Sequence, residues 1–542
     1  MKLVINSHEI EAAPGPSLFD WAERLGVRVP TTCLKQGKCR ECLLEVIEGM
    51  EHLSERTPHE EHLAGRFRLA CRTRIEANAG TVRCHTLRRA AMRIEHAGSG
   101  LGDDGGPGAR LLDPAVTRDG DRVLLDGREI ARSSGPLCGL AMDLGTTTVV
   151  LRLFDLESGA PLASTAFENP QRFGGSDVIA RIAYDTSHPG RLLQRTLLGY
   201  LTHAIEELPV DPESIYELVV AGNSTMRDLF FGLDVHSIGQ KPYRSITQHE
   251  LDSGERSSTS VASTARRLRL PICPQARVQA LPLISGHVGA DAAACLLAID
   301  MPREQRRVAL MDIGTNTELI LGRRGRILAA SCPAGPAFEG GSIACGMPGL
   351  EGAIEHVRLA ADGRVETVVI GESAPQGLCG SGLVELLGEL LRTGRLNARG
   401  RFTDGSDDFV VDAEHAIALG ERDISELAQA KGANAAGLQI VLRRYGISVS
   451  DIDVLYLAGA FGRHLDLDAA RRVGLIPDLP DAKIRQVGNA AIEGASVALL
   501  SSTRRSELES LVRSVEHVPL ESDPDFFDTF SAACLLGPAE PA

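Results

Sequence analysis

The sequence lacks any long apolar run. Among its 542 residues there is no stretch of about 18 or more apolar residues, so no membrane-spanning helix is expected. The opening residues, Met-Lys-Leu-Val-Ile-Asn-Ser, also lack the apolar core and the cleavage site of a signal peptide. Basic residues are fewer than acidic ones, and a net charge of −15 argues against binding to nucleic acid or to an anionic membrane. We therefore expect a cytoplasmic protein with neither a membrane nor nucleic acid as a partner.

The sequence also lacks the Gly-Lys-Ser/Thr phosphate loop, which excludes a P-loop enzyme at the level of motifs. Twelve cysteines are present, but the cytoplasmic thiol pool would keep them reduced, so they are not expected to form a disulfide framework. Four of them lie between Cys33 and Cys71, and the others are scattered as far as Cys534. This distribution predicts one metal site and several ordinary buried thiols.

With 43% apolar and 24% charged residues, the chain has the composition of a globular protein and is long enough for several domains. Residues 2–13 predict two short strands, and Leu18, Trp21, Ala22 and Leu25 share one face of a helix. A cysteine-rich loop and a strand from Cys42 follow. This order predicts a small β-grasp domain over residues 1–94, with Trp21 in its core.

Glycine dominates residues 97–108, which cannot bury an apolar face and are predicted to be flexible. We therefore assign residues 95–138 to a linker with a small hairpin near Arg122–Ile130. From residue 139 to 538 apolar strands alternate with amphipathic helices, an α/β pattern.

An internal repeat divides this second part of the chain. Met142-Asp-Leu-Gly-Thr-Thr-Thr and Met311-Asp-Ile-Gly-Thr-Asn-Thr are identical at five of seven positions. Each lies between two hydrophobic runs, which indicates a strand, a turn and a strand. The repeat predicts a duplicated fold whose second half begins near residue 305.

The cysteine cluster is spaced for an iron–sulfur centre. Cys33, Cys39 and Cys42 form a C-x5-C-x2-C motif, and Cys71 follows in Arg-Leu-Ala-Cys-Arg. A 2Fe–2S cluster takes four thiolates, here three from one loop and one from a distant strand. Structural zinc also accepts four thiolates and stays an alternative, although zinc sites usually show two C-x2-C knuckles. Cys84 lies outside the pattern and is predicted to be a packed thiol.

This portion resembles adrenodoxin- and plant-type ferredoxins, and the five-residue first gap is the adrenodoxin form. The repeated Asp-x-Gly-Thr segments bring an acid, a glycine and hydroxyl groups to a turn, where glycine allows phosphate to approach backbone N–H groups and Asp can hold Mg²⁺. Leu455-Tyr-Leu-Ala-Gly-Ala-Phe-Gly-Arg adds a strand that runs into a glycine-rich turn.

Together these three segments resemble the phosphate and adenosine motifs of the actin/Hsp70/sugar-kinase superfamily. The resemblance implies an α/β ATP-binding domain with two RNase H-like halves and a nucleotide between them. It makes Asp143 and Asp312 the Mg²⁺-binding and water-orienting catalytic acids. The implied phosphate-binding residues are Gly145, Thr146, Thr147, Gly314, Thr315 and Asn316, and Gly459 and Gly462 would lie near the adenosine.

The whole chain, a ferredoxin domain joined to this ATPase fold, resembles the reductive activators of corrinoid proteins. The resemblance covers residues 1–95 and 139–535 and rests further on Val220-Ala-Gly-Asn-Ser-Thr-Met, Gly377-Leu-Cys-Gly-Ser-Gly and Gly488-Asn-Ala-Ala-Ile-Glu-Gly-Ala. It implies ATP-dependent, one-electron reduction of cob(II)amide to cob(I)amide on a partner protein. Plant-type 2Fe–2S centres lie near about −400 mV. The family's Co(II)/Co(I) step lies lower still, so ATP must drive the transfer through two conformations of different affinity.

The resemblance further implies a corrinoid protein of a methyltransferase system and an electron-donating reductase or flavoprotein as partners, and it leaves a homodimer open. Ser331, in a Gly/Pro-rich loop, is the candidate to approach the cobalt, although this loop would equally serve to close the nucleotide cleft. Two other hypotheses remain: an activator of another low-potential enzyme, and an ATP-gated electron carrier with negligible turnover. The N-terminal ferredoxin pattern speaks against the first of these.

Overall fold

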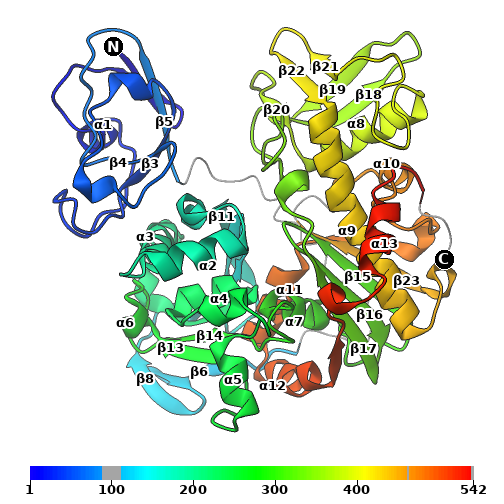
Figure 1. The fold of residues 1–542 in the computed structure, drawn as a ribbon. Helices are drawn as coiled ribbons and strands as arrows, with labels where there is room; N and C mark the ends of the chain where they lie inside the picture. Colours follow the sequence, from blue (N-terminus) through cyan, green and yellow to red (C-terminus); the bar gives the residue numbers. More distant parts are fainter. Residues whose placement is uncertain (88–110, 460–462, 539–542) are drawn as a thin grey trace. The chain divides into compact units, whose positions relative to one another are not determined.

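The fold is described from a computed structural model that covers residues 1–87, 111–459 and 463–538. Its described residues form two compact units. The first unit combines those of Met1–Ile94 with Pro114–Ala280, and the second combines those of Glu95–Asp113 with Leu281–Ala542 (Figure 1). The segment 97–108, predicted to be flexible, lies outside the described residues.

The N-terminal part is a β-grasp domain with one helix. Its sheet has the strand order β2-β1-β5-β3-β4, in which β1 and β5 are parallel. The strands are β1 (Lys2–Ile5), β2 (His8–Glu11), β3 (Leu43–Glu48), β4 (Phe67–Leu69) and β5 (Thr81–Thr86), and the helix is α1 (Leu18–Arg24). Ser17 and Asp20 form a capping box that fixes the start of α1. Trp21 is 4% exposed and Cys84 is fully buried, so both are core residues as predicted.

The first unit continues with a small three-stranded sheet and then a six-stranded one. The small sheet, of order β6-β7-β8, contains β6 (Val116–Asp119), β7 (Arg122–Leu125) and β8 (Arg128–Arg132). The large sheet has the order β11-β10-β9-β12-β14-β13. Its strands are β9 (Cys138–Leu144), β10 (Thr148–Asp155), β11 (Pro161–Glu168), β12 (Ile215–Gly222), β13 (Val261–Thr264) and β14 (Arg277–Ala280). The accompanying helices are α2 (Val178–Ser187), α3 (Leu192–Glu206), α4 (Ser224–Phe231), α5 (Ile246–Asp252) and α6 (Ala265–Leu268).

The second unit contains a six-stranded sheet of the same plan, with the order β24-β23-β15-β16-β17-β25. Its strands are β15 (Val308–Ile313), β16 (Thr317–Arg323), β17 (Arg326–Cys332), β23 (Val454–Ala458), β24 (Ile484–Gly488) and β25 (Val515–His517). In both sheets an antiparallel meander of three strands is followed by two parallel strands, β12 and β14 in one and β23 and β24 in the other. This shared topology confirms the duplicated fold that the sequence repeat predicts.

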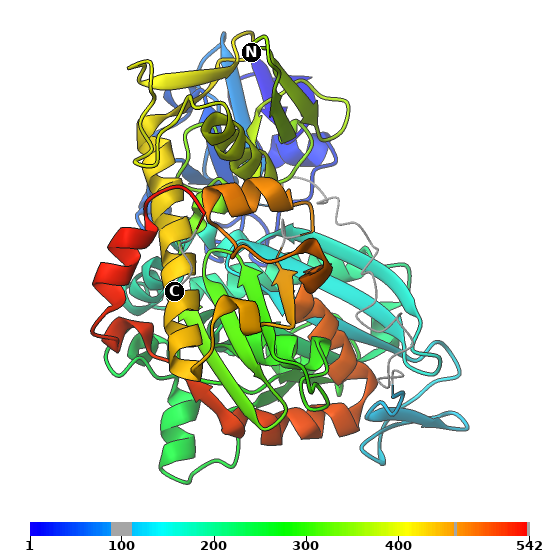
Figure 2. The same cartoon turned by 90° about the vertical axis from the view of Figure 1, so that its right-hand side faces the viewer.

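Helices cover the second sheet and extend beyond it. They are α7 (Ala290–Ala298), α8 (Gly380–Arg392), α9 (Glu421–Tyr445), α10 (Leu467–Val473), α11 (Ala490–Leu500), α12 (Ser502–Leu511) and α13 (Phe526–Ala533). The long helix α9 contacts β16 and β17, and α13 packs against α9 (Figure 2). Within α8, four leucines are fully buried: Leu383, Leu386, Leu387 and Leu390.

The second unit also carries two small sheets. One has the order β19-β18-β20, with β18 (Ala353–Leu359), β19 (Val365–Val369) and β20 (Gly377–Leu378), and α8 packs on β18. The other pairs β21 (Asp408–Asp412) with β22 (Ile417–Gly420). None of the helices in the described residues combines the length and apolar character needed to cross a membrane.

Candidate cluster and nucleotide sites

The four predicted cluster ligands lie at one end of the β-grasp domain. Cys33, Cys39 and Cys42 occupy the loop between α1 and β3, and Cys71 follows β4. All of them are free thiols, and only Cys33 is partly exposed. The Sγ atoms of Cys42 and Cys71 are 3.3 Å apart, and the Cys33 and Cys39 side chains interact with each other. The structure therefore brings the four thiols together as two pairs.

Backbone amides surround these sulfur atoms. Burial raises the pKa of the Cys33 thiol, but the N–H groups of Cys39, Lys38 and Gln36, together with the Cys39 side chain, bring it down to about 7. The Cys42 thiol donates to Cys71, and this bond lowers the pKa of Cys71. The Gly37 amide also lowers the pKa of Cys71. An iron–sulfur cluster contains negatively charged sulfides and thiolates, and nearby backbone N–H groups stabilise that charge by hydrogen bonding.

Two thiol pairs and a ring of amides fit a 2Fe–2S cluster, in which each iron takes two cysteine ligands. Among residues 1–87, 111–459 and 463–538, no three His, Cys, Asp or Glu side chains stand close enough to hold a single metal ion. The fit consequently rests on the thiol pairs and the amides. Gly37 has a φ of +74°, a conformation that other residues rarely adopt, so this position of the loop favours glycine.

The first Gly-Thr turn joins β9 to β10. Asp143 lies in β9, and the Gly145 N–H closes the turn by donating to the Thr148 carbonyl at 2.9 Å. The side chain of Asn169, which is fully buried, donates to the Gly145 carbonyl at 2.8 Å. The Asn169 N–H donates to the Thr147 carbonyl at 2.7 Å.

A second asparagine holds the hydroxyl group of this turn. Asn223 Nδ2 donates to Thr146 Oγ1 at 3.0 Å, while Asn223 Oδ1 caps α4 by accepting from the Met226 N–H at 2.9 Å. Gly145, Thr146 and Thr147 are thus held on one turn, directly after Asp143 in β9. Asn169 carries no motif signal of its own, whereas Asn223 belongs to the Ala-Gly-Asn-Ser-Thr segment that supports the family resemblance.

The second turn, between β15 and β16, brings together Asp312, Gly314, Thr315 and Asn316. Thr315 Oγ1 donates to Glu339, which ends the short helix η6 (Pro336–Glu339). Gly459 lies against this turn, because a Cβ on Gly459 would be 2.2 Å from the Ile313 carbonyl oxygen. Gly462, the other predicted adenosine residue, lies outside the described residues.

Several acids converge near Asp312. Burial and the neighbouring Asp291 on α7 raise the pKa of Asp312 to about 7, and burial raises that of Asp291 to about 6. Glu318, 7% exposed, has its pKa raised well above the ordinary value by burial and by both aspartates. Neighbouring buried carboxylates repel one another, so a hard cation such as Mg²⁺ would stabilise them, although no three acids of the described residues stand close enough to ligate one ion together. Asp291, Glu318 and Glu339 come from separate segments, and the sequence by its spacing assigns none of them a role in this site.

Ser331, the candidate for contact with cobalt, is the penultimate residue of β17. Its hydroxyl donates to Glu318 Oε1 at 3.2 Å, and the side chain is half-buried. In this structure the Ser331 hydroxyl is thus engaged with the acidic group.

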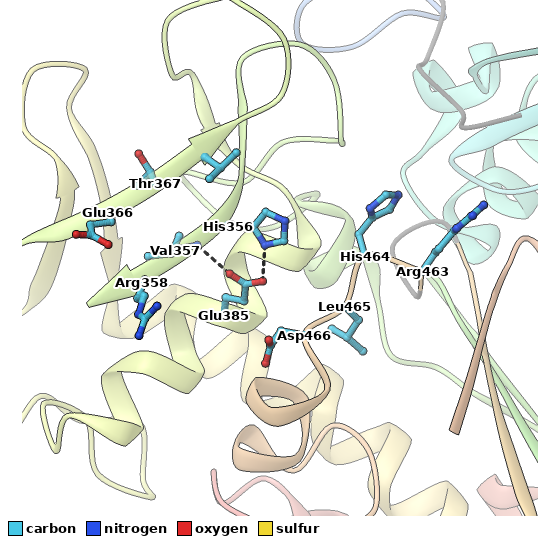
Figure 3. Close-up of a pocket in the computed structure, with 11 residues that line it drawn as sticks. His356, Val357, Arg358, Glu366, Thr367, Glu385, Arg463, His464, Leu465 and Asp466 are labelled. Atoms are coloured by element: carbon cyan, nitrogen blue, oxygen red, sulfur yellow. Dashed lines mark hydrogen bonds and ion pairs between the residues drawn. The ribbon is translucent and has the colours of Figure 1, made fainter. Parts of the chain in front are cut away.

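A cavity of about 610 Å³ is lined in part by Arg463, which follows the predicted adenosine turn in the sequence. Figure 3 shows Arg463 and His464 on one side of it and the strands β18 and β19 on the other. His356 Nδ1 lies 2.7 Å from Glu385 Oε1, and the Val357 N–H donates to the other oxygen of Glu385 at 2.9 Å. The cavity therefore combines cationic groups with a fixed carboxylate.

Comparisons with known proteins identify the family to which the chain belongs. Family descriptions match three successive parts of the chain: "2Fe-2S iron-sulfur cluster binding domain" at residues 4–76, "RACo middle region" at 138–304 and "C-terminal domain of RACo the ASKHA domain" at 307–541. The chain is 33% identical over 432 residues to the corrinoid activation enzyme RamQ of Eubacterium limosum, covering 74% of this chain and 71% of that one. The chain belongs to the corrinoid activation enzymes.

Two further matches agree with this family. The chain is 24% identical over 414 residues to the "[Co(II) methylated amine-specific corrinoid protein] reductase" of Methanosarcina barkeri. This match covers 72% of this chain and 75% of that one. A solved structure, a reductive activator for a corrinoid, iron–sulfur protein, aligns with a TM-score of 0.71 and 26% identity over 99% of this chain and 98% of that one. As a corrinoid activation enzyme, the chain combines a 2Fe–2S ferredoxin domain with an actin-like ATPase-type domain. The predicted fold class, family and cluster type are confirmed.

Proposed function

We propose that this chain reduces the Co(II) form of a corrinoid protein by one electron to the Co(I) form and couples this step to ATP hydrolysis. The observation that carries the proposal is the match over nearly its whole length to a reductive activator, together with the paired thiols of the N-terminal domain. Cys33, Cys39, Cys42 and Cys71 would hold the cluster, which supplies one-electron transfer when bound.

The proposed nucleotide site uses the two Gly-Thr turns. Backbone N–H groups and hydroxyls at Gly145–Thr147 and Gly314–Asn316 would bind phosphate oxygens, with the adenosine near Gly459 and Gly462. Asp143 and Asp312 would hold Mg²⁺ and orient the attacking water. The raised pKa of Asp312 supports this role, because a divalent cation would relieve its repulsion from Asp291.

The test measures formation of Co(I) by its absorption spectrum under anaerobic conditions, with a Co(II) corrinoid protein, a chemical reductant and Mg-ATP. We expect Co(I) only when both ATP and reductant are present, and Asp312→Asn should abolish ATP turnover and Co(I) formation while keeping the iron content. Equal reduction with and without ATP would contradict the coupling. ATP-dependent Co(I) formation with negligible steady-state hydrolysis would instead favour the ATP-gated carrier.

The proposed electron donor is a reductase or flavoprotein that binds the cluster loop on its solvent-exposed side. In support, Leu34 is 82% exposed and follows Cys33, the most exposed of the four ligands. A homodimer remains a prediction, which sedimentation of the loaded protein would test.

A further inference from the structure

The cluster loop carries a buried acid that the predicted ligand set does not use. Glu41 lies between Cys39 and Cys42 and is 3% exposed. Thr32 Oγ1 donates to Glu41 Oε1 at 3.1 Å, while Glu41 Oε2 is buried with no hydrogen-bond partner among the described residues. A negative charge held in this loop, two residues from Cys39 and next to Cys42, disfavours further negative charge on the neighbouring sulfur atoms. A buried carboxylate at this position works against reduction of the cluster.

The cation that compensates this acid comes from outside the ferredoxin domain. Arg195 is on α3, in the first half of the ATPase-type domain, and its Nη2 donates to Glu41 Oε1 at 3.0 Å. The same nitrogen donates to the Cys39 carbonyl at 2.8 Å. One guanidinium group therefore holds both a ligand residue of the cluster and the acid beside it.

Other contacts between the same two parts of the first unit accompany this one. Arg172, on the short helix η3 (Pro170–Gly174), forms an ion pair with Glu45 of β3 at 2.6 Å, and both side chains are largely buried. The Leu87 N–H donates to the Tyr200 hydroxyl of α3 at 3.1 Å. Arg28 pairs with Glu206 at 2.7 Å near the end of α3, where both groups are exposed. Arg195 thus belongs to a docked arrangement of the ferredoxin domain on α3 and η3.

We propose that Arg195 is a positioning residue that raises the reduction potential of the cluster whenever the ferredoxin domain is docked on α3. Its charge neutralises Glu41 and favours the reduced cluster, which carries one more negative charge than the oxidised form. When the domain leaves α3, Glu41 loses this partner and the cluster becomes a stronger reductant.

This difference suits a carrier that must both accept and deliver one electron. Docked, the cluster takes the electron more readily from its donor; undocked, it gives the same electron more readily to Co(II). The delivery of the electron to Co(II) rests on the proposed function. The shift in potential does not, because it can be measured without ATP or a corrinoid protein.

The experiment is a redox titration of the full chain with its cluster loaded, monitored by the EPR signal of the reduced form. We expect Arg195→Gln to lower the potential, with the ratio of reduced to oxidised cluster falling about tenfold at a fixed potential, about 59 mV for one electron. Glu41→Gln should raise the potential. The double variant Arg195→Gln/Glu41→Gln should return close to the parent value, and Arg195→Lys should shift less than Arg195→Gln.

Arg28→Gln is the matched control, since it removes an arginine from the same interface away from the cluster loop and should leave the potential unchanged. An unchanged potential in Arg195→Gln, or an equal shift in Arg28→Gln, would overturn the proposal. So would a double variant that keeps the full shift of Arg195→Gln. If Arg195→Gln fails to retain iron, Glu41→Gln decides alone: a rise in potential supports the proposal, and no rise overturns it.

Discussion

Two asparagines, Asn169 fully buried and Asn223 half-buried, support the first Gly-Thr turn at the level of single residues. Asn169 binds the backbone on both sides of the turn, and Asn223 binds the Thr146 hydroxyl and caps α4. Amide side chains suit this task because each supplies both a donor and an acceptor. The turn is therefore fixed before any phosphate reaches it.

Asn169→Ala should destabilise the first half and weaken ATP binding. The change leaves the Gly145 carbonyl without its buried donor, which costs about 1–3 kcal/mol. Urea unfolding and the KM for ATP report the two effects. Asn397→Ala is the control, since Asn397 is exposed and accepts from backbone N–H groups in a surface turn. Equal effects of both variants would contradict a special role for Asn169.

His62 makes the stability of the first unit depend on pH. Burial, Arg40 and His188 lower its pKa from 6.5 to about 4, while Glu60 acts weakly in the opposite direction. Since the folded pKa is depressed, the unfolded chain binds more protons between pH 6.5 and 4, and the free energy of unfolding falls as pH decreases through this window.

At pH 5 the loss from His62 relative to pH 7 should be about 2 kcal/mol at most. The measurement compares urea unfolding of the parent and His62→Gln at both pH values, and the variant should lose less stability. His8→Gln, which changes an exposed histidine in the same domain, should behave like the parent. A His62→Gln protein with the parent's full pH dependence would contradict this assignment.

The turn after β23 is a feature at the scale of secondary-structure elements. Gly459 has a φ of +105°, and its N–H donates to the Gly488 carbonyl at 3.0 Å at the end of β24. It also lies close to Ile313 at the end of β15. The ends of three parallel strands thus meet at the second Gly-Thr turn, at the edge where α/β sheets usually bind ligands.

Gly459→Ala should disrupt this edge of the sheet. The new Cβ would lie 2.2 Å from the Ile313 carbonyl oxygen, in addition to the strain of a positive φ, so we expect a loss of about 3 kcal/mol or more. Gly488→Ala is a matched control, since φ is +67° there but the nearest atom is 4.0 Å away. Its cost should be about 1–2 kcal/mol. Similar unfolding free energies and ATP affinities for the two variants would contradict the close approach.

For the molecule as a whole, the sequence predicts that residues 95–138 link the ferredoxin domain to the ATPase-type domain. The glycine-rich sequence of residues 97–108 predicts a flexible tether. Such a tether would let the ferredoxin domain leave α3 and reach a corrinoid protein while staying at high local concentration.

Deleting half of residues 97–108 should therefore slow Co(II) reduction several-fold and leave ATP hydrolysis unchanged. Stopped-flow absorbance for Co(I) and a steady-state ATPase assay measure the two rates. A variant with a Gly/Ser segment of the original length should keep the parent's reduction rate. An unchanged rate in the shortened variant would count against a moving ferredoxin domain.

From the sequence alone, four cluster ligands are predicted, and the two Gly-Thr turns and the duplicated fold can be recognised. Cys33, Cys39 and Cys42 lie in one loop, and each Gly-Thr turn is a short contiguous segment, so local spacing is enough to recognise them. The internal repeat can be recognised for the same reason, since each copy contains its two strands and the turn between them in one short segment. The predicted roles of Asp143 and Asp312 in ATP hydrolysis remain predictions.

The folded structure shows which distant residues serve these sites. Asn169 reaches the first turn, Asp291 faces Asp312, and Arg195 meets Glu41 across 154 positions of sequence. The two residues of each pair lie far apart in the sequence, with no characteristic number of residues between them. They meet because the elements that carry them pack together in the folded chain, which no local sequence pattern reveals. Motifs therefore locate the reacting groups, whereas long-range packing sets the electrostatic environment in which those groups act.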